Sequence, residues 1–273
     1  MDHKQYYQYQ FIKNEYDVKK NHIRLDMNDE KIWIEFIRNQ EISSIKKYLI
    51  DSKVEKILEI GGNNGFLAKI LADWGFEVTS IDINPSPTYF DVKKMDAINL
   101  EFSPNTFDLV FSSHVIAHIK EKKLLFDQIN KILKDDGLII HIVPSNWWSL
   151  ITNFWHYVLL PKVLYKKIKN TPNSEKFLEN DKNTSNYKKN RLMNLLFFHP
   201  LGTEKSFINE IFKFSKKNWS KMFVSFGFIV NNELNGPLVY SGYNIFSNRG
   251  YKIRKILSGV FPCSYIFITK KIV

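Results

Sequence analysis

The chain carries Lys56-Ile57-Leu58-Glu59-Ile60-Gly61-Gly62-Asn63-Asn64-Gly65-Phe66-Leu67, in which an apolar strand is followed by a glycine-rich turn and the start of a helix. In parallel α/β sheets this order forms a nucleotide-sized pocket at the carboxyl end of the first strand. The glycines Gly61, Gly62 and Gly65 allow a tight turn and let a ligand approach the main-chain amides. Free N–H groups at the start of the expected helix, residues 66–74, then favour a carboxylate or a phosphate.

Length and composition indicate a folded protein of a reducing compartment. The 273 residues, 44% of them hydrophobic, suffice for one large domain or for one domain with a sizeable insertion. The single cysteine, Cys263, excludes an intramolecular disulfide and a cysteine metal cluster, which fits the cytoplasm. Residues 1–20 are polar and no apolar run reaches about 18 residues, so neither a signal peptide nor a spanning helix is expected.

The net charge of +11 has two interpretations. One is an anionic partner, such as nucleic acid, a membrane surface or a phosphorylated substrate. The other is a general enrichment in lysine, with the charges scattered over solvated faces. The chain contains no tight arginine cluster, which favours the second interpretation.

A second strand is expected over residues 77–83, and it ends on an acid. Asp82 lies 21 positions after Gly61. In nucleotide-binding α/β units, an acid at this distance accepts hydrogen bonds from ribose hydroxyls. An ordinary helix cap is the structural alternative for this residue.

The other expected elements continue the alternation of helices and strands. An amphipathic helix over residues 32–50 should pack beside the first strand and close part of the pocket edge. The remaining expectations are strands at 89–93, 107–114, 138–143, 228–232 and 263–270, and helices at 122–133 (capped by 134–137), 209–214 and 216–226. This order predicts a parallel sheet with helices on both faces.

Several of these segments carry motifs in a recognisable order. They are Glu59-Ile60-Gly61-Gly62-Asn63-Asn64-Gly65, Asp82, Asp96-Ala97, Phe107-Asp108-Leu109-Val110 with Val115-Ile116-Ala117-His118-Ile119, and Leu133-Lys134-Asp135-Asp136-Gly137. Together they resemble class I S-adenosylmethionine-dependent methyltransferases of types 11 and 12 over residues 54–145. The resemblance implies a Rossmann-like, mostly parallel seven-stranded sheet with an antiparallel last strand, helices on both faces and an α-helical insertion after strand five.

The same resemblance implies S-adenosylmethionine as cofactor and a set of residues that bind it. These are Glu59, Gly61, Gly62, Asn63, Gly65, Asp82, Ile83, Asp96, Ala97 and Ser113. Asp96 and Ala97 are expected to flank the adenine, and the backbone near Ser113 to line the methionine arm. Asn63 stands where the family usually has glycine, but asparagine tolerates a left-handed backbone better than most residues.

Two other nucleotide cofactors fit the turn less well. A dinucleotide site would want Gly-x-Gly-x-x-Gly, whereas the spacing here is Gly-Gly-x-x-Gly, which leaves less room for a pyrophosphate. A P-loop would end in Gly-Lys-Ser or Gly-Lys-Thr, and the turn lacks this ending.

Two histidines follow the fourth strand at the expected pocket rim. His118 and His114 lie four positions apart, and either is a candidate base for deprotonating a hydroxyl acceptor. A purely structural role is the alternative for both, and a metal site is not expected because no third ligand is evident nearby. His141 is expected to be a core histidine within the fifth strand, and His199 to reach the pocket from the insertion.

An aromatic segment, residues 146–161, precedes lysines at 162, 166, 167 and 169. It predicts either a helix that covers the substrate pocket as a lid or an interfacial helix with its aromatic side chains in an anionic membrane. Residues 170–189 predict a long mobile loop. The segments Val143-Pro144-Ser145, His199-Pro200-Leu201-Gly202, Trp219 and Ser241-Gly242-Tyr243 loosely resemble methyltransferases of surface-glycan and lipid biosynthesis.

The sequence thus predicts an N-terminal helical segment (1–52), a cofactor-binding core (53–145), a substrate-cap insertion (146–215) and a C-terminal completion of the sheet (216–273). We expect a cytoplasmic methyltransferase that acts on an oxygen of a small-molecule, sugar or lipid-linked acceptor, with peripheral contact to the inner face of the membrane through the insertion. Two alternatives stay open: a nucleic-acid methyltransferase or binder, and a non-catalytic adaptor with the methyltransferase fold.

Overall fold

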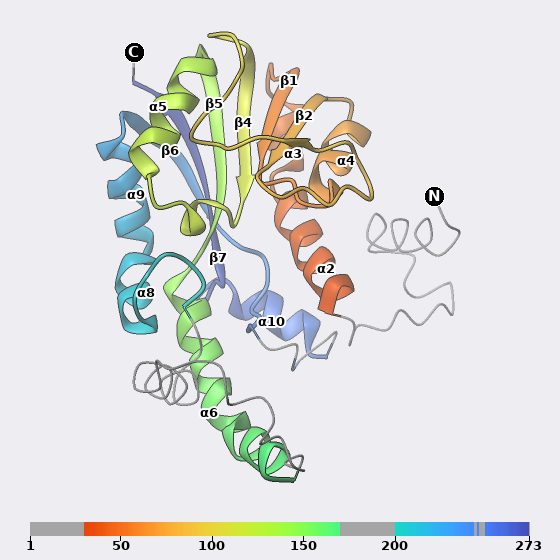
Figure 1. Cartoon of the computed structure of the whole chain (residues 1–273), viewed down its shortest axis with the longest axis vertical. Coiled ribbons are helices and arrows are strands. Elements are labelled where there is room, and N and C mark those ends of the chain that lie inside the picture. The colour runs from red at the N-terminus through yellow and green to blue at the C-terminus, as the bar shows by residue number, and fades with distance from the viewer. Residues whose placement is uncertain (1–29, 170–199, 243–244, 246–248, 273) are drawn as a thin grey trace, which may run out of the picture.

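A seven-stranded sheet forms the centre of the computed structural model, which describes residues 30–169, 200–242, 245 and 249–272 (Figure 1). The strands are β1 (Lys56–Ile60), β2 (Glu77–Asp82), β3 (Lys93–Lys94), β4 (Phe107–Ser113), β5 (Leu133–Pro144), β6 (Phe228–Asn235) and β7 (Ser264–Lys271). Their order in the sheet is β3-β2-β1-β4-β5-β7-β6. The first five strands pair in parallel, whereas β7 runs antiparallel to both β5 and β6. The predicted mostly parallel sheet with an antiparallel last strand is therefore confirmed.

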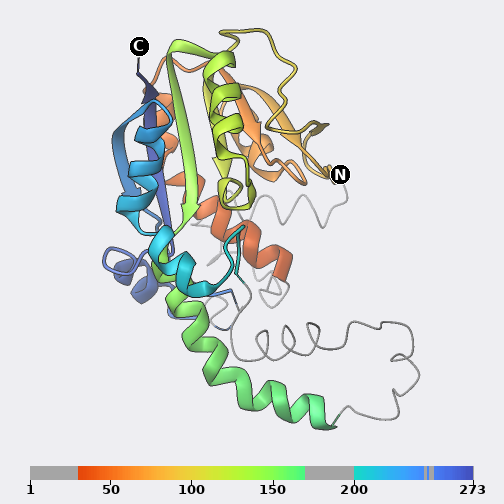
Figure 2. The ribbon, with the colours of Figure 1, turned by 60° about the vertical axis from the view of Figure 1, so that its left-hand side comes forward.

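Helices cover both faces of the sheet (Figure 2). They are α2 (Glu30–Ser43), α3 (Lys46–Ile50), α4 (Phe66–Asp73), α5 (Lys122–Ile132), α6 (Asn146–Lys169), α8 (Phe207–Lys213), α9 (Lys216–Ser225) and α10 (Tyr251–Leu257), with a short 3-10 helix η2 (Ile116–His118). Successive strand residues point to opposite faces. Leu58 and Val110 therefore pack in the core beneath α5 and α9, whereas Ile57 and Leu109 pack beneath α3 and α4.

The lead helix is broken in two, which differs from the predicted continuous helix over residues 32–50. α2 ends at Ser43, and α3 begins at Lys46. The Ser44 hydroxyl donates to the Glu41 carbonyl oxygen at 2.6 Å, and such local bonds compete with helical ones. Ile45, between the two helices, is fully buried in the core below β1.

The third strand is far shorter than the predicted residues 89–93. β3 contains only Lys93 and Lys94. The backbone before β3 forms its hydrogen bonds with the glycine-rich turn instead of with β2. The N–H groups of Thr88 and Tyr89 both donate to the Asn64 carbonyl oxygen at 3.0 Å. This segment therefore covers the glycine-rich turn instead of extending the sheet.

The fifth strand begins earlier than the predicted residue 138, and the predicted helix cap at residues 134–137 is wrong. α5 ends at Ile132, and β5 runs from Leu133. Leu133 has extended dihedral angles, is fully buried and lies opposite Phe107 of β4. Burial of this leucine in the sheet overrides the local Asp-Asp-Gly signal for a helix end.

The aromatic insertion begins with a helix, as predicted. α6 leaves the carboxyl end of β5 and contains Pro161 (Figure 1). At its start the Ser145 hydroxyl accepts from the Trp148 N–H at 3.1 Å, and the Trp219 indole N–H donates to the Pro144 carbonyl oxygen at 2.9 Å. The predicted loop at residues 170–189 and the predicted position of His199 lie outside the described residues.

Trp219 should be a principal anchor of this junction. Its ring is 3% exposed and stacks on Phe214 and Phe223, so Trp219→Ala should lower the free energy of unfolding by about 3–5 kcal/mol. Trp219→Phe keeps an aromatic ring but leaves the Pro144 carbonyl without its donor, for a loss of about 1–3 kcal/mol. Urea unfolding would measure both changes. The control Lys217→Ala, at an exposed position of the same helix, should stay within about 0.5 kcal/mol, and an equal effect of all three would refute the anchoring role.

Candidate functional site

The glycine-rich turn after β1 has little room for side chains. Gly61 and Gly65 have φ values of +82° and +77°, and Asn63 has +44°, so asparagine adopts the left-handed backbone expected of it. A Cβ atom on Gly61 would lie 2.1 Å from a Val115 methyl carbon, and one on Gly62 would lie 1.9 Å from the Ser80 hydroxyl oxygen. Only glycine fits at these two positions.

Asp82 ties the end of β2 to this turn. One of its carboxylate oxygens accepts the Asn63 N–H at 3.0 Å, and the other accepts the Asn84 N–H at 2.8 Å. No helix begins directly after Asp82, since residues 83–106 contain none, so the helix-cap alternative is wrong. Two carboxylate oxygens offer about four acceptor positions, which leaves capacity for ribose hydroxyls.

Fewer N–H groups at the start of α4 are available to a ligand than the sequence suggested. The Asn64 side chain accepts the Phe66 N–H at 3.2 Å, and Glu59 accepts the Ala68 N–H. Glu59 is buried and also accepts from the Ser80 hydroxyl at 2.6 Å. Burial raises the pKa of Glu59 to about 7, although both hydrogen bonds oppose the rise. Two N–H groups of the first turn are thus already paired within the chain.

Two cavities meet at Gly61. The α2 cavity, about 660 Å³, lies between α2 and the glycine-rich turn, and the β2 cavity, about 450 Å³, lies beyond the end of β2. The α2 cavity is lined by Glu59, Gly61, Gly62, Asn63 and Ser113 of the predicted set, and the β2 cavity by Gly61, Asp82, Ile83, Asp96 and Ala97. Gly65 lines neither, because the backbone of Phe90 packs against it. The structure therefore brings nine of the ten predicted binding residues to one cleft.

The cleft suits a nucleoside that carries an amino-acid arm. Asp82 offers acceptors, and the 57%-exposed Ile83 offers an apolar surface for a base. Within the α2 cavity, the Ser113 hydroxyl is buried and has no hydrogen-bond partner among the described residues. A buried polar atom without a partner is costly unless a ligand pairs with it.

α2 contributes a wall of the cleft that sequence reasoning left without assigned residues. Lys31, Glu35 and Arg38 line the α2 cavity. Glu35 is 4% exposed and accepts from the Asn64 side-chain amide at 3.0 Å and from the Tyr89 hydroxyl at 3.1 Å. Acidic residues on the apolar face of an amphipathic helix were the available signal, because buried carboxylates need specific partners.

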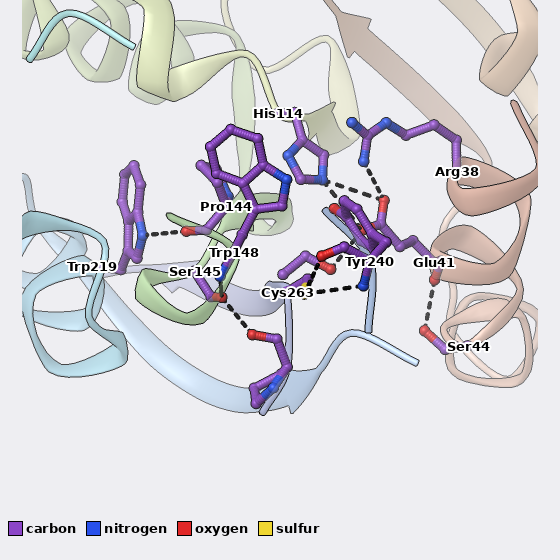
Figure 3. Close-up of polar contacts among 12 residues, drawn as sticks. Arg38, Glu41, Ser44, His114, Pro144, Ser145, Trp148, Trp219, Tyr240 and Cys263 are labelled. Atoms are coloured by element: carbon purple, nitrogen blue, oxygen red, sulfur yellow. Dashed lines mark hydrogen bonds and ion pairs between the residues drawn. The ribbon is translucent and has the colours of Figure 1, made fainter. Parts of the chain in front are cut away.

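His114 and His118 both line the β2 cavity. His114 lies one residue beyond β4 rather than within it, with a φ of +59°. Its Nε2 atom lies 3.3 Å from each carboxylate oxygen of Glu41, which also contacts Arg38 (Figure 3). His118, on η2, is exposed, and partial desolvation together with the Lys122 charge lowers its pKa. The two candidate bases therefore share a cavity but differ in their partners.

His141 is a core residue, as predicted. It is 1% exposed and packs on Phe223, and its Nδ1 atom lies 2.7 Å from the Ser112 hydroxyl oxygen. Burial lowers the pKa of His141 to about 3, so the ring is neutral. Its position excludes it from the cleft.

The aromatic insertion lines a separate apolar surface, the α6–α10 groove of about 750 Å³. Its apolar walls are Trp147, Leu150, Ile151, Phe154 and Trp155 of α6, with Val239, Ile253, Leu257 and Phe261 of the C-terminal part, and Arg249, Gly250 and Arg254 complete its lining. Trp148 points elsewhere and is buried near Trp33. No described residue of α6 lines the α2 or β2 cavity, and none of the helices within the described ranges has the length and apolar character needed to cross a membrane.

Several known proteins with similar sequence or structure are named as methyltransferases. The sequence model of the methyltransferase domain family matches residues 33–229. The 2-methyl-6-phytyl-1,4-hydroquinone methyltransferase of Synechocystis is 29% identical over 114 residues, which cover 34% of this chain and 36% of that protein. The ubiquinone biosynthesis O-methyltransferase of Bartonella tribocorum is 26% identical over 175 residues, which cover 58% of this chain and 66% of that protein.

The similarity to a solved structure extends over more of the chain, but the sequence identity is lower. A SAM dependent methyltransferase from Archaeoglobus fulgidus superposes with a TM-score of 0.48 and 15% identity, over 89% of this chain and 100% of that one. The matches to curated relatives span only 33% to 66% of those proteins' lengths. The family model, by contrast, covers most of the present chain, including the glycine-rich turn, Asp82, Asp96 and both candidate histidines. The chain therefore belongs to the methyltransferase domain family, which implies S-adenosylmethionine as its cofactor.

Proposed function

We propose that the protein is an S-adenosylmethionine-dependent methyltransferase that methylates an oxygen of a small or lipid-linked acceptor. The observation that carries the proposal is the cleft at Gly61, where a backbone turn closed to side chains meets the carboxylate of Asp82. Asp82 would hold the ribose, Ile83, Asp96 and Ala97 would surround the adenine, and the Gly62 backbone with the Ser113 hydroxyl would contact the amino-acid arm.

The bound cofactor supplies a methyl carbon that its sulfonium already activates. The protein then has to hold an acceptor in line with that carbon and exclude water. A hydroxyl acceptor also needs a base, and His114 and His118 are the candidates because both line the β2 cavity. We propose no metal for this step.

An acceptor with an apolar tail is supported by the α6–α10 groove. Its walls are almost wholly apolar, as is typical of sites for hydrophobic ligands. The names of two relatives refer to a phytyl hydroquinone and to ubiquinone biosynthesis. We extend this chemistry to the present chain as part of the proposal.

The same region supports contact with an anionic membrane. Ile253 and Ile256 of α10 are 64% and 77% exposed, and Phe154 of α6 is 62% exposed. Lys252 lies on the same short helix, and the whole chain carries a net charge of +11. Exposed apolar side chains beside cations are suited to the interface of an anionic bilayer.

Cofactor affinity should depend on Asp82. In Asp82→Ala the ribose loses charge-assisted hydrogen bonds and the turn loses its tie to β2, so binding of S-adenosylmethionine should weaken about 10- to 100-fold. Isothermal titration would measure this. Asp127→Ala, which removes an acid from the exposed face of α5, is the control and should bind like the wild type. Equal affinities of all three proteins would overturn the assignment of Asp82.

The acceptor class should emerge from a transfer assay with a labelled methyl group. The wild-type protein would be incubated with labelled S-adenosylmethionine and, separately, with lipid, glycan and RNA fractions. We expect base-stable label in the lipid or glycan fraction, as an ether or other O-methyl product. Label in RNA alone would favour the nucleic-acid alternative, and cofactor binding with no label in any fraction would favour the adaptor alternative.

Membrane contact should depend on α10. Ile253→Asp combined with Ile256→Asp should reduce flotation with anionic vesicles about tenfold or more, because two apolar side chains no longer enter the interface. The control pair, Val224→Asp with Ile229→Asp, changes side chains that are 53% and 51% exposed elsewhere. If both pairs float like the wild type, the membrane is not the partner of this surface.

A further inference from the structure

We propose that Glu41 is a positioning residue that fixes the tautomer of His114 and so presents its Nδ1 atom as the base of the cleft. The inference rests on the proposed transfer to a hydroxyl. Sequence analysis assigned no role to Glu41, which lies on the last full turn of α2, 73 positions before His114.

Glu41 is a buried carboxylate held from four directions. It is 1% exposed, and its oxygens contact Arg38 of α2 at 2.7 Å, the Tyr240 hydroxyl at 3.3 Å, the Ser264 hydroxyl at 2.5 Å and His114 at 3.3 Å (Figure 3). The cation of Arg38 and the hydrogen bonds hold the pKa of Glu41 far below its usual range despite burial. The group is therefore an anion near neutral pH.

An anionic carboxylate dictates which nitrogen of His114 carries the proton. Carboxylate oxygens only accept hydrogen bonds, so the Nε2 atom facing Glu41 must be the donor. Burial and the charge of Arg38 lower the pKa of His114, while Glu41 partly opposes the shift. A neutral imidazole with its proton on Nε2 has a lone pair on Nδ1.

We place this lone pair at the β2 cavity. His114 lines the β2 cavity with Asp82 and Asp96, and no described residue forms a hydrogen bond with its Nδ1 atom. The His114 backbone is left-handed, a strained conformation for a non-glycine residue that persists where surrounding contacts impose it. Here the His114 N–H donates to the Ile142 carbonyl oxygen at 2.7 Å, and the ring is held by Glu41.

The proton step follows from this arrangement. The O–H bond of the acceptor would break, its proton would pass to Nδ1, and the oxygen would keep the electron pair with which it bonds to the methyl carbon. The carbon–sulfur bond of the sulfonium would break at the same time, and its electron pair would remain on the sulfur as a neutral thioether. The resulting imidazolium still donates from Nε2 to Glu41, whose negative charge stabilises it. The proton then leaves Nδ1 for water, which restores the neutral ring.

Because the charged groups around His114 have opposite signs, we expect their removal to shift the pKa of His114 in opposite directions. Arg38 and Glu41 face it from α2, Tyr240 contacts Glu41 from the segment before α10, and His118 lies on η2 beyond it. Removal of the Glu41 charge should lower the pKa of His114, whereas removal of the Arg38 charge should raise it. A structural defect alone would not move the two variants in opposite directions.

The test is nitrogen NMR of the full chain labelled at its histidines, without cofactor or acceptor. In the wild type, His114 should be the Nε2–H tautomer with a pKa below 6.5. In Glu41→Gln its pKa should fall and the two tautomers should mix. In Arg38→Met its pKa should rise by about one pH unit with the tautomer kept. His118, which Glu41 does not contact, serves as the internal control and should titrate alike in all three proteins.

The Nδ1–H tautomer in the wild type, or a His114 titration that neither variant changes, would overturn the inference. If Glu41→Gln does not fold, Arg38→Met and the wild-type tautomer still decide it. The outcome is separate from that of the proposed function. Failure of the wild type to bind S-adenosylmethionine refutes the proposed function, whereas the NMR result concerns only how Glu41 holds His114.

Discussion

The hydrogen bond from the Asn63 N–H to Asp82 joins the glycine-rich turn to the end of β2, and the cleft depends on it. The backbone of Gly61 and Gly62 also donates to the Ile81 carbonyl oxygen, so the turn lies directly on the second strand. A Cβ atom on either glycine would clash with a neighbouring side chain, so the turn leaves no room for side chains at these positions. These constraints fix the point where the two cavities meet, and at that point Gly61 presents only its backbone to a ligand.

A second constraint acts from the opposite wall. α2 is amphipathic, yet it buries two acids, Glu35 and Glu41, on its inner side. Glu35 holds Asn64 of the turn, and Glu41 holds His114 beyond β4. One helix therefore positions both the cofactor side and the candidate base of the cleft. Burial of charge is costly, and such groups remain where their partners are specific.

The sequence predicted the parts of the site whose residue type and spacing are local. Glycines within five positions, an acid at the end of the next strand and an asparagine able to adopt a left-handed backbone sufficed to locate the cleft. The predictions failed where contacts between residues distant in the sequence determine the local structure. Residues 89–92 look strand-like but cover the turn, and the local signal at 134–137 yields to burial of Leu133 in the sheet. The partners of Glu41 include Tyr240 and Ser264, which lie 199 and 223 positions away, so no local pattern could reveal them.

The most direct test of this account is a calorimetric comparison of S-adenosylmethionine, NAD and ATP as ligands of the wild-type chain. The turn has neither the spacing of a dinucleotide site nor the lysine of a P-loop, while Asp82 and Ser113 suit a nucleoside with an amino-acid arm. We predict saturable binding of S-adenosylmethionine and no binding of the other two nucleotides at millimolar concentration. Binding of NAD or ATP in its place, or no binding of S-adenosylmethionine at that concentration, would contradict the account.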